Sequence, residues 1–440
     1  MNKYLWKSGN DEPIDAEIMD FLAGQDVILD RELFLHDIRA TVAHVNGLQR
    51  IDILSREEQQ RLCAALDNLA ECFRNGDFQL DDQFEDGHSA IEFMLTEQLG
   101  ELGKKVHTGR SRNDQVLVAS RLYLKQQLES IVRLNYRTAL ACLEQAETHS
   151  MAPMPGYTHL QRAVPSSIGL WLGGFAESFT DNLVAAINAH ELLDCSPLGT
   201  AAGYGVNLPL DREGVAKELG FQRLQINPLS AQNSRGKFEI IALEAAGLAL
   251  LDVRRLAWDL SLYTTSEFDF VRLHDRYTTG SSIMPNKRNP DVVEILRASF
   301  AVVQGARAEI AELLSLPSGY QRDLQLTKAP MIRGLQRCVQ ALQLVPGLVE
   351  SLEFNFGKME AAITAEMYAT DLAVESAGRG VPFRTAYENT KNQLSEAKGL
   401  ATESLSRRTS PGACGALQLD AIRTRLEAEF SAFPAAISRS

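Results

Sequence analysis

Hydrophobic residues recur at helical spacing through five long stretches of this chain. Residues 113–150, 166–193 and 237–263 carry apolar side chains every three or four positions, and 291–316 and 324–352 repeat the pattern. Stretch 237–263 is apolar on nearly all sides, which is typical of a helix enclosed in a bundle. Because globular helices average roughly 11–12 residues, several helices about twice that long indicate a long-helix bundle.

Strand signals are sparse, so we predict an all-α fold. We divide the chain into an N-terminal helical domain (1–108), a central helical bundle (109–355) and a C-terminal helical domain (356–440). The long helices carry more apolar surface than one thin bundle can cover. Self-association is therefore expected.

Composition narrows the function classes. The chain has 440 residues and a formal net charge of −13, which argues against nucleic-acid or anionic-membrane partners. Its six cysteines form no CxxC pair and fit buried small side chains in a reducing compartment. Residues 1–14 lack the apolar core of a signal peptide, and no run of about 18 apolar residues occurs. We therefore expect a cytoplasmic protein.

Four polar segments interrupt the helices, and the first combines residues 84–92 with 106–115. The second part places Arg110, Ser111, Arg112 and Asn113 just before a long helix. Arginine, hydroxyl and amide donors near a helix N-terminus suit a carboxylate ligand. The alternative is a helix N-cap surrounded by solvated charges. The acidic cluster in residues 81–86 is interpreted as a solvated turn rather than a metal site.

The other three segments also mix polar groups with Gly and Pro. Residues 154–162 place His159 in a loop ahead of a helix, where a surface histidine is the alternative. Residues 277–290 contain Ser281 and Lys287, which suit a base beside a stabilising cation or, equally, a plain connection between helices. Residues 317–328 combine Tyr, Gln, Arg and Lys at a helix start. Phosphate-loop, HExxH and GxSxG motifs are absent from the sequence.

The run Gly280-Ser-Ser-Ile-Met-Pro-Asn-Lys-Arg-Asn-Pro290 closely resembles the signature loop of the fumarase/aspartase superfamily. Residues 107–115 and 154–162 are similar to the argininosuccinate lyase version of its other motifs, as are 85–88 and 370–384. The resemblance runs from about residue 20 to about residue 390. It implies a homotetramer with a twenty-helix core, in which three subunits build each active site.

The implied reaction is the anti β-elimination of argininosuccinate to L-arginine and fumarate in arginine biosynthesis, with neither metal nor cofactor. A base removes the proton beside a carboxylate, the charge spreads into that carboxylate, and the C–N bond breaks. The resemblance assigns the base to Ser281, charge stabilisation to Lys287, the general acid to His159 and its carboxylate partner to Glu294. The succinyl carboxylates would be held by Ser111, Asn113, Thr158, Lys287 and Asn289. The arginine portion would be held by Tyr320, Gln325 and Lys328, and further substrate contacts would come from His88, Arg112 and Arg235.

Several positions depart from the family pattern. Asp26 stands where the family has a substrate-contacting serine, and residues 227–239 differ from its usual acidic run, with Arg235 as the match to its arginine. Arg322 stands where lysine is common. These departures leave open a lyase for another N-substituted aspartate: a modified argininosuccinate, adenylosuccinate or a diamine–succinate adduct. A non-catalytic relative, as among lens crystallins, is disfavoured because Ser281 and His159 are retained.

Overall fold

The computed structural model describes residues 16–23, 25–81, 83–392 and 400–433. Across these residues the chain is helical, and its short strands form two-stranded sheets only. This confirms the all-α prediction. The N-terminal segment, for which the sequence predicts no signal peptide, lies outside the described residues. None of the helices described has the length and apolar character needed to cross a membrane.

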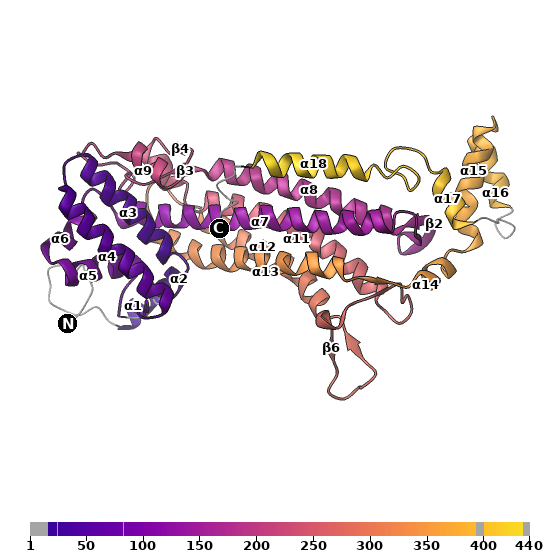
Figure 1. The fold of residues 1–440 in the computed structure, drawn as a ribbon, viewed down its shortest axis with the longest axis horizontal. Coiled ribbons are helices and arrows are strands. Elements are labelled where there is room, and N and C mark those ends of the chain that lie inside the picture. Colours follow the sequence, from indigo (N-terminus) through magenta and orange to yellow (C-terminus); the bar gives the residue numbers. More distant parts are fainter. Residues whose placement is uncertain (1–15, 24, 82, 393–399, 434–440) are drawn as a thin grey trace. The chain divides into compact units, whose positions relative to one another are not determined.

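Five long helices match the five periodic stretches of the sequence (Figure 1). The last begins four residues later than predicted, because a 3₁₀ helix, η3, precedes it. The elements are α7 (Arg112–Thr148), α8 (Ile168–Leu193), α11 (Lys237–Tyr263), α12 (Asp291–Leu313), η3 (Arg322–Thr327) and α13 (Lys328–Glu350).

The chain divides into two compact units. Unit 1 comprises residues 1–129, 188–244 and 303–336, and unit 2 comprises the remainder. Each of the five long helices contributes residues to both units. The three-domain division of the sequence stays a prediction.

Unit 1 is built on a small helical core. Phe34 on α3 packs against Phe73 on α4, with 4.8 Å between ring centroids, and both helices pack with α5 (Figure 1). Ser55 caps α4 and Asp86 caps α5, each in a reciprocal capping box that satisfies helix-end amides. The elements are α1 (Ala16–Ala23), α2 (Asp26–Asp30), α3 (Phe34–Arg50), α4 (Arg56–Asn75), α5 (Gly87–Leu99), α6 (Glu101–Lys104) and η1 (Lys105–His107), followed by β3 (Cys195–Ser196), α9 (Arg212–Glu218), β4 (Arg223–Leu224) and α10 (Pro228–Asn233).

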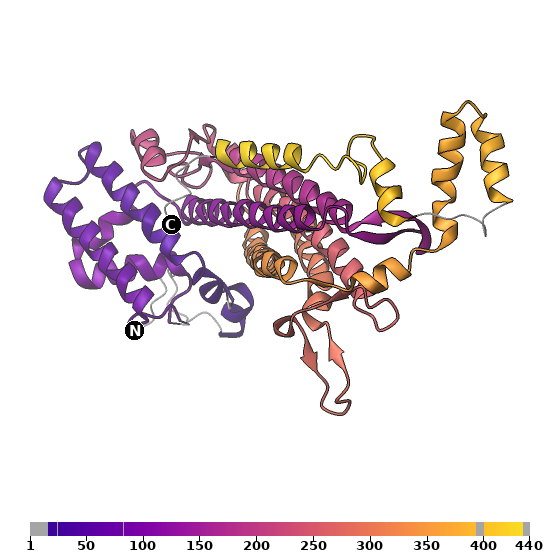
Figure 2. The same cartoon turned by 45° about the vertical axis from the view of Figure 1, so that its right-hand side comes forward.

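Unit 2 contains two hairpins. β1 pairs antiparallel with β2, and β6 pairs with β7, whose connecting loop extends away from the helices of its own unit (Figure 2). Helices α15 and α16 lie side by side in both views. The elements are β1 (Pro153–Thr158), β2 (Gln161–Ser167), β5 (Val271–Arg272), η2 (Asp275–Tyr277), β6 (Thr279–Gly280), β7 (Arg288–Asn289), β8 (Glu353–Phe354), α14 (Phe356–Ala361), η4 (Ala365–Tyr368), α15 (Ala369–Gly378), α16 (Phe383–Lys391), α17 (Ala401–Arg407) and α18 (Leu419–Ala432).

Candidate active site

The segment before α7 is held in place by a buried carboxylate. Asp114 is fully buried and accepts three backbone N–H bonds, from Ser111 at 2.8 Å, Gly199 at 3.0 Å and Ala201 at 2.9 Å. Burial raises the pKa of Asp114 despite these bonds. The three donors join two parts of the chain, so Asp114 fixes the segment that carries the predicted anion-binding residues.

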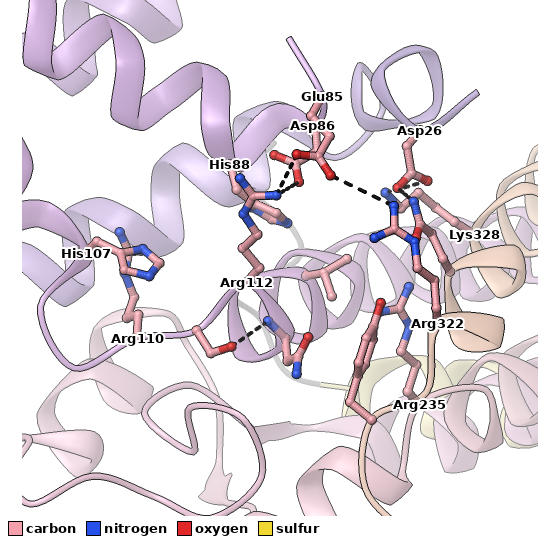
Figure 3. A pocket seen from close by; sticks show the side chains of 15 residues that line it. Asp26, Glu85, Asp86, His88, His107, Arg110, Arg112, Arg235, Arg322 and Lys328 are labelled. Carbon is pink, nitrogen blue, oxygen red and sulfur yellow. Dashed lines mark hydrogen bonds and ion pairs between the residues drawn. The ribbon is translucent and has the colours of Figure 1, made fainter. Parts of the chain in front are cut away.

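Arg112 lies against two acidic side chains rather than in solvent. Its Nη1 is 3.0 Å from Glu85 Oε2 and 3.2 Å from Asp86 Oδ2, and both carboxylates are buried (Figure 3). Burial alone raises the pKa of Asp86, but His88, Arg112 and the Ser89 hydrogen bonds together lower it below its ordinary value. The interpretation of the acidic cluster as a solvated turn is therefore wrong for Glu85 and Asp86, while Asp82 lies outside the described residues. Glu85 and Asp86 orient a guanidinium, which the sequence alone gave no means to detect.

His88 forms a buried ion pair with Asp37 through its Nδ1. Burial works against a charged imidazole, but Asp37, Asp86 and Asp30 raise the pKa of His88 above its ordinary value. Its Nε2 has no hydrogen-bond partner in the described part of the chain. His88 therefore lines the pocket with one buried ring nitrogen that has no partner among the described residues.

A buried lysine binds two carboxylates on another wall. Lys328 Nζ is 2.6 Å from Asp30 Oδ1 and 3.3 Å from Asp26 Oδ1, and the amide of Gln325 donates to Asp26. Burial opposes the charge, yet Asp30 and Asp26 raise the pKa of Lys328. The other oxygen of Asp30 accepts the backbone N–H of Gly87 at 2.8 Å. One carboxylate thus joins the start of α13 to the start of α5.

Two further arginines reach the same pocket. Arg322 on η3 forms an ion pair with Glu85 at 3.9 Å. Arg235 is only 6% exposed, and no carboxylate of the described residues lies within 4.0 Å of its guanidinium. Figure 3 shows Arg235 on the side of the pocket that also carries Asp26, Arg322 and Lys328. Its charge is available to an anionic ligand.

Fifteen residues line this cavity of about 450 Å³, all from unit 1. Both cationic and anionic side chains line it, so it suits a ligand that carries both signs of charge. The lining residues are Asp26, Glu85, Asp86, His88, His107, Arg110, Ser111, Arg112, Asn113, Val116, Arg235, Tyr320, Arg322, Gln325 and Lys328.

Six of the predicted site residues belong to unit 2, and none of the six lines this cavity. His159 and Leu160 form the two-residue turn between β1 and β2, both with positive φ, 54° and 57°. The prediction of a loop ahead of a helix is wrong here, because a hairpin carries His159. Its turn lacks the glycine by which a sequence signals such hairpins. Thr158 is the last residue of β1, and both it and His159 are exposed.

The β6–β7 loop carries three more of the six. The Ser281 hydroxyl oxygen accepts the N–H groups of Ile283 at 3.3 Å and Met284 at 3.1 Å, while Lys287 is exposed and Asn289 ends β7. Glu294 lies exposed in the first turn of α12. No hydrogen bond or ion pair joins two of the six side chains, all of which the structure describes.

Nearly the whole chain is similar to known lyases. A sequence model of a family described as lyase matches residues 19–305. Argininosuccinate lyase of Stenotrophomonas maltophilia (strain R551-3) is 57% identical over 430 residues, which cover 97% of this chain and 100% of the relative. This chain belongs to the argininosuccinate lyase family. Argininosuccinate lyase of Xylella fastidiosa (strain 9a5c) is also 57% identical, over 94% of this chain and 93% of the relative.

Solved structures support the fold. The crystal structure of EDDS lyase in complex with formate is similar with a TM-score of 0.80 at 22% identity, covering 97% of this chain and 92% of that one. Class II fumarase from Schistosoma mansoni gives a TM-score of 0.70 at 16% identity, covering 92% and 91%. The fold is therefore that of the fumarase/aspartase superfamily, as predicted.

Eight residues predicted from the argininosuccinate lyase resemblance meet in the one cavity: His88, Ser111, Arg112, Asn113, Arg235, Tyr320, Gln325 and Lys328. Seven lining residues were not predicted as site residues. Arg110 and His107 lie in the motif of residues 107–115, so their place in that motif could have identified them. Burial lowers the pKa of His107 to about 4, assisted by Arg110 and Arg112, so that its imidazole is neutral at pH 7. Three acidic residues of the lining are held there by ion pairs with cations distant in the sequence, which the sequence does not reveal. They are Asp26, Glu85 and Asp86.

Proposed function

We propose that this chain is an argininosuccinate lyase that reversibly cleaves argininosuccinate into L-arginine and fumarate, in arginine biosynthesis. The observation that carries this is the 57% identity to argininosuccinate lyases over nearly the full chain, joined to a cavity lined by eight predicted substrate-binding residues. Argininosuccinate carries carboxylates, an ammonium and a guanidinium, so a cavity lined by both signs of charge complements it.

The succinyl carboxylates bind at Ser111 and Asn113 in this proposal, with Thr158, Lys287 and Asn289 completing that end. Support comes from the fixed segment before α7, where Asp114 holds the backbone of Ser111. Donors held rigidly toward a carboxylate stabilise the charge that develops there during proton abstraction.

The arginine portion binds at Tyr320, Gln325 and Lys328. All three line the cavity from the segment that leads into α13, and further contacts come from His88, Arg112 and Arg235. This end recognises the group that leaves as arginine.

Ser281 is the base in the proposed mechanism. A serine hydroxyl removes a carbon-bound proton only when nearby positive charge lowers its pKa, and Lys287 supplies that charge. His159 delivers a proton to the leaving nitrogen, directly or through water, with Glu294 as its carboxylate partner. The exposed loop between β6 and β7 closes over the substrate and excludes water.

A homotetramer with sites shared by three subunits completes the proposal. It is supported by the exposure of the Ser281 loop and of the hairpin tip. It is also supported by large apolar side chains left exposed on the long helices in unit 2: Leu170, Leu248, Leu251, Trp258, Ile295 and Leu344. We place the enzyme in the cytoplasm, in keeping with its six free cysteines.

The direct test follows fumarate absorbance after purified protein is mixed with argininosuccinate. Wild-type protein should form fumarate, and Ser281→Ala should reduce the rate by about 10²- to 10⁴-fold. Mixed tetramers of Ser281→Ala and Arg112→Gln chains should recover activity, because some sites then receive both intact residues. A folded wild type that forms no fumarate would exclude this substrate, and adenylosuccinate and diamine–succinate adducts would be tried next.

A further inference from the structure

Asp26 is a pocket carboxylate that shares its ion-pair cation, Lys328, with a second carboxylate. Its side chain is 12% exposed, and its nearest cation, Lys328, lies closer to Asp30, at 2.6 Å against 3.3 Å for Asp26. One ammonium thus serves two carboxylates. Burial raises the pKa of Asp26, and Lys328 only partly opposes this.

Arg235 is a buried cation on the same side of the cavity. The residue is 6% exposed and lines the pocket, and no carboxylate of the described chain lies within 4.0 Å of its guanidinium. Asp26 and Arg235 are close enough to influence each other electrostatically, yet they form no ion pair. Opposite charges that face one cavity without contacting each other need a ligand to satisfy both.

We infer that Asp26 and Arg235 form a zwitterion clamp, in which Asp26 binds the α-ammonium and Arg235 the α-carboxylate of the arginine end of the substrate. The inference rests on the proposed function and adds to it a specificity rule. The enzyme requires an intact α-amino acid on the guanidine that leaves. A guanidine that lacks either charged group leaves one charged side chain of the clamp without its ligand contact, and a lost contact to a charged group discriminates strongly between ligands.

The test uses the reverse reaction, in which fumarate is consumed by addition of a guanidine. Arginine is compared with desaminoarginine, which lacks the α-ammonium, and with agmatine, which lacks the α-carboxylate. Asp26→Asn should lower the ratio of kcat/KM for arginine to that for desaminoarginine by about 10- to 100-fold. Arg235→Gln should lower the ratio for arginine over agmatine by a similar factor. Asp26→Glu keeps the charge and should retain more of the first ratio than Asp26→Asn does.

The Asp26→Asn variant should still fold, because Lys328 keeps its ion pair with Asp30. Asp323→Asn is the matched control: it removes an exposed carboxylate from η3 outside the cavity and should leave both ratios at wild-type values. An Asp26→Asn variant that loses activity on arginine and desaminoarginine equally, or that keeps the wild-type ratio, overturns the clamp. A wild type that adds no arginine to fumarate overturns the proposed function itself, and the two failures are distinguishable.

Discussion

Replacing Lys328 with Met should destabilise the protein through charge rather than through packing. Its Nζ lies 2.6 Å from Asp30 and 3.3 Å from Asp26, and its side chain is 3% exposed. At an effective dielectric constant of about 20, these contacts contribute about 5 to 6 kcal/mol each of gross attraction, which desolvation of the ammonium largely offsets. Removal of one partner of such a buried pair costs about 3–5 kcal/mol, because the remaining charges are left uncompensated.

Urea unfolding followed by circular dichroism measures this cost. The double variant Lys328→Met/Asp30→Asn should be more stable than Lys328→Met alone, because it leaves one buried carboxylate instead of two. Lys104→Met is the control, since Lys104 is 56% exposed and its pair with Glu101 should contribute less than about 1 kcal/mol. If Lys328→Met costs no more than this control, or if the double variant is no more stable than the single one, the electrostatic reasoning is refuted.

Three further predictions follow from other features. Arg112→Lys keeps the charge but replaces the planar guanidinium, whose Nη1 contacts both Glu85 and Asp86, with an ammonium that cannot bind a carboxylate in bidentate fashion. The value of kcat/KM for argininosuccinate should therefore fall about 10-fold or more, and an unchanged value would contradict this. Because the folded pKa of His107 is about 4, below its ordinary 6.5, its stabilising effect is present above pH 6.5 and is lost as pH falls toward 4. His107→Gln should therefore lose less urea resistance over that interval than wild type, and an equal loss would contradict it. Leu160 has a left-handed backbone with φ 57°, and Leu160→Gly should relieve its strain. The free energy of unfolding should rise by about 1 kcal/mol and the thermal midpoint should rise slightly; a lower midpoint would refute the strain.

The long helices were predictable because more than five turns of apolar periodicity leave little ambiguity. The predicted stretch 237–263 coincides with α11, and the stretch 291–316 exceeds α12 by three residues. The start of α13 was missed because residues 322–327 adopt a 3₁₀ helix. Residues 153–167 were not predicted as strands, because prolines argue against a strand and the turn lacks the glycine typical of a hairpin.

Site residues could be predicted where several of them lie next to each other in the sequence. The residues from Arg110 to Asn113 concentrate donors in one motif, and three of them were predicted as substrate contacts. Asp26 and Asp30 could not be assigned partners, because the lysine that binds them is almost 300 residues away. Ion pairs of that kind are decided by tertiary packing, about which helix propensity and hydrophobic periodicity carry no information.

That separation has a consequence for the order of synthesis. Asp30 leaves the ribosome 298 residues before Lys328. At about 5–20 residues per second, the nascent chain carries its acidic pair without a counter-ion for roughly 15–60 s. The α3–α5 core can pack during this interval, but the pocket cannot close until the start of α13 has been made. A chain terminated before residue 328 is thus left with two unneutralised carboxylates in the segment that contributes Asp26 to the candidate pocket.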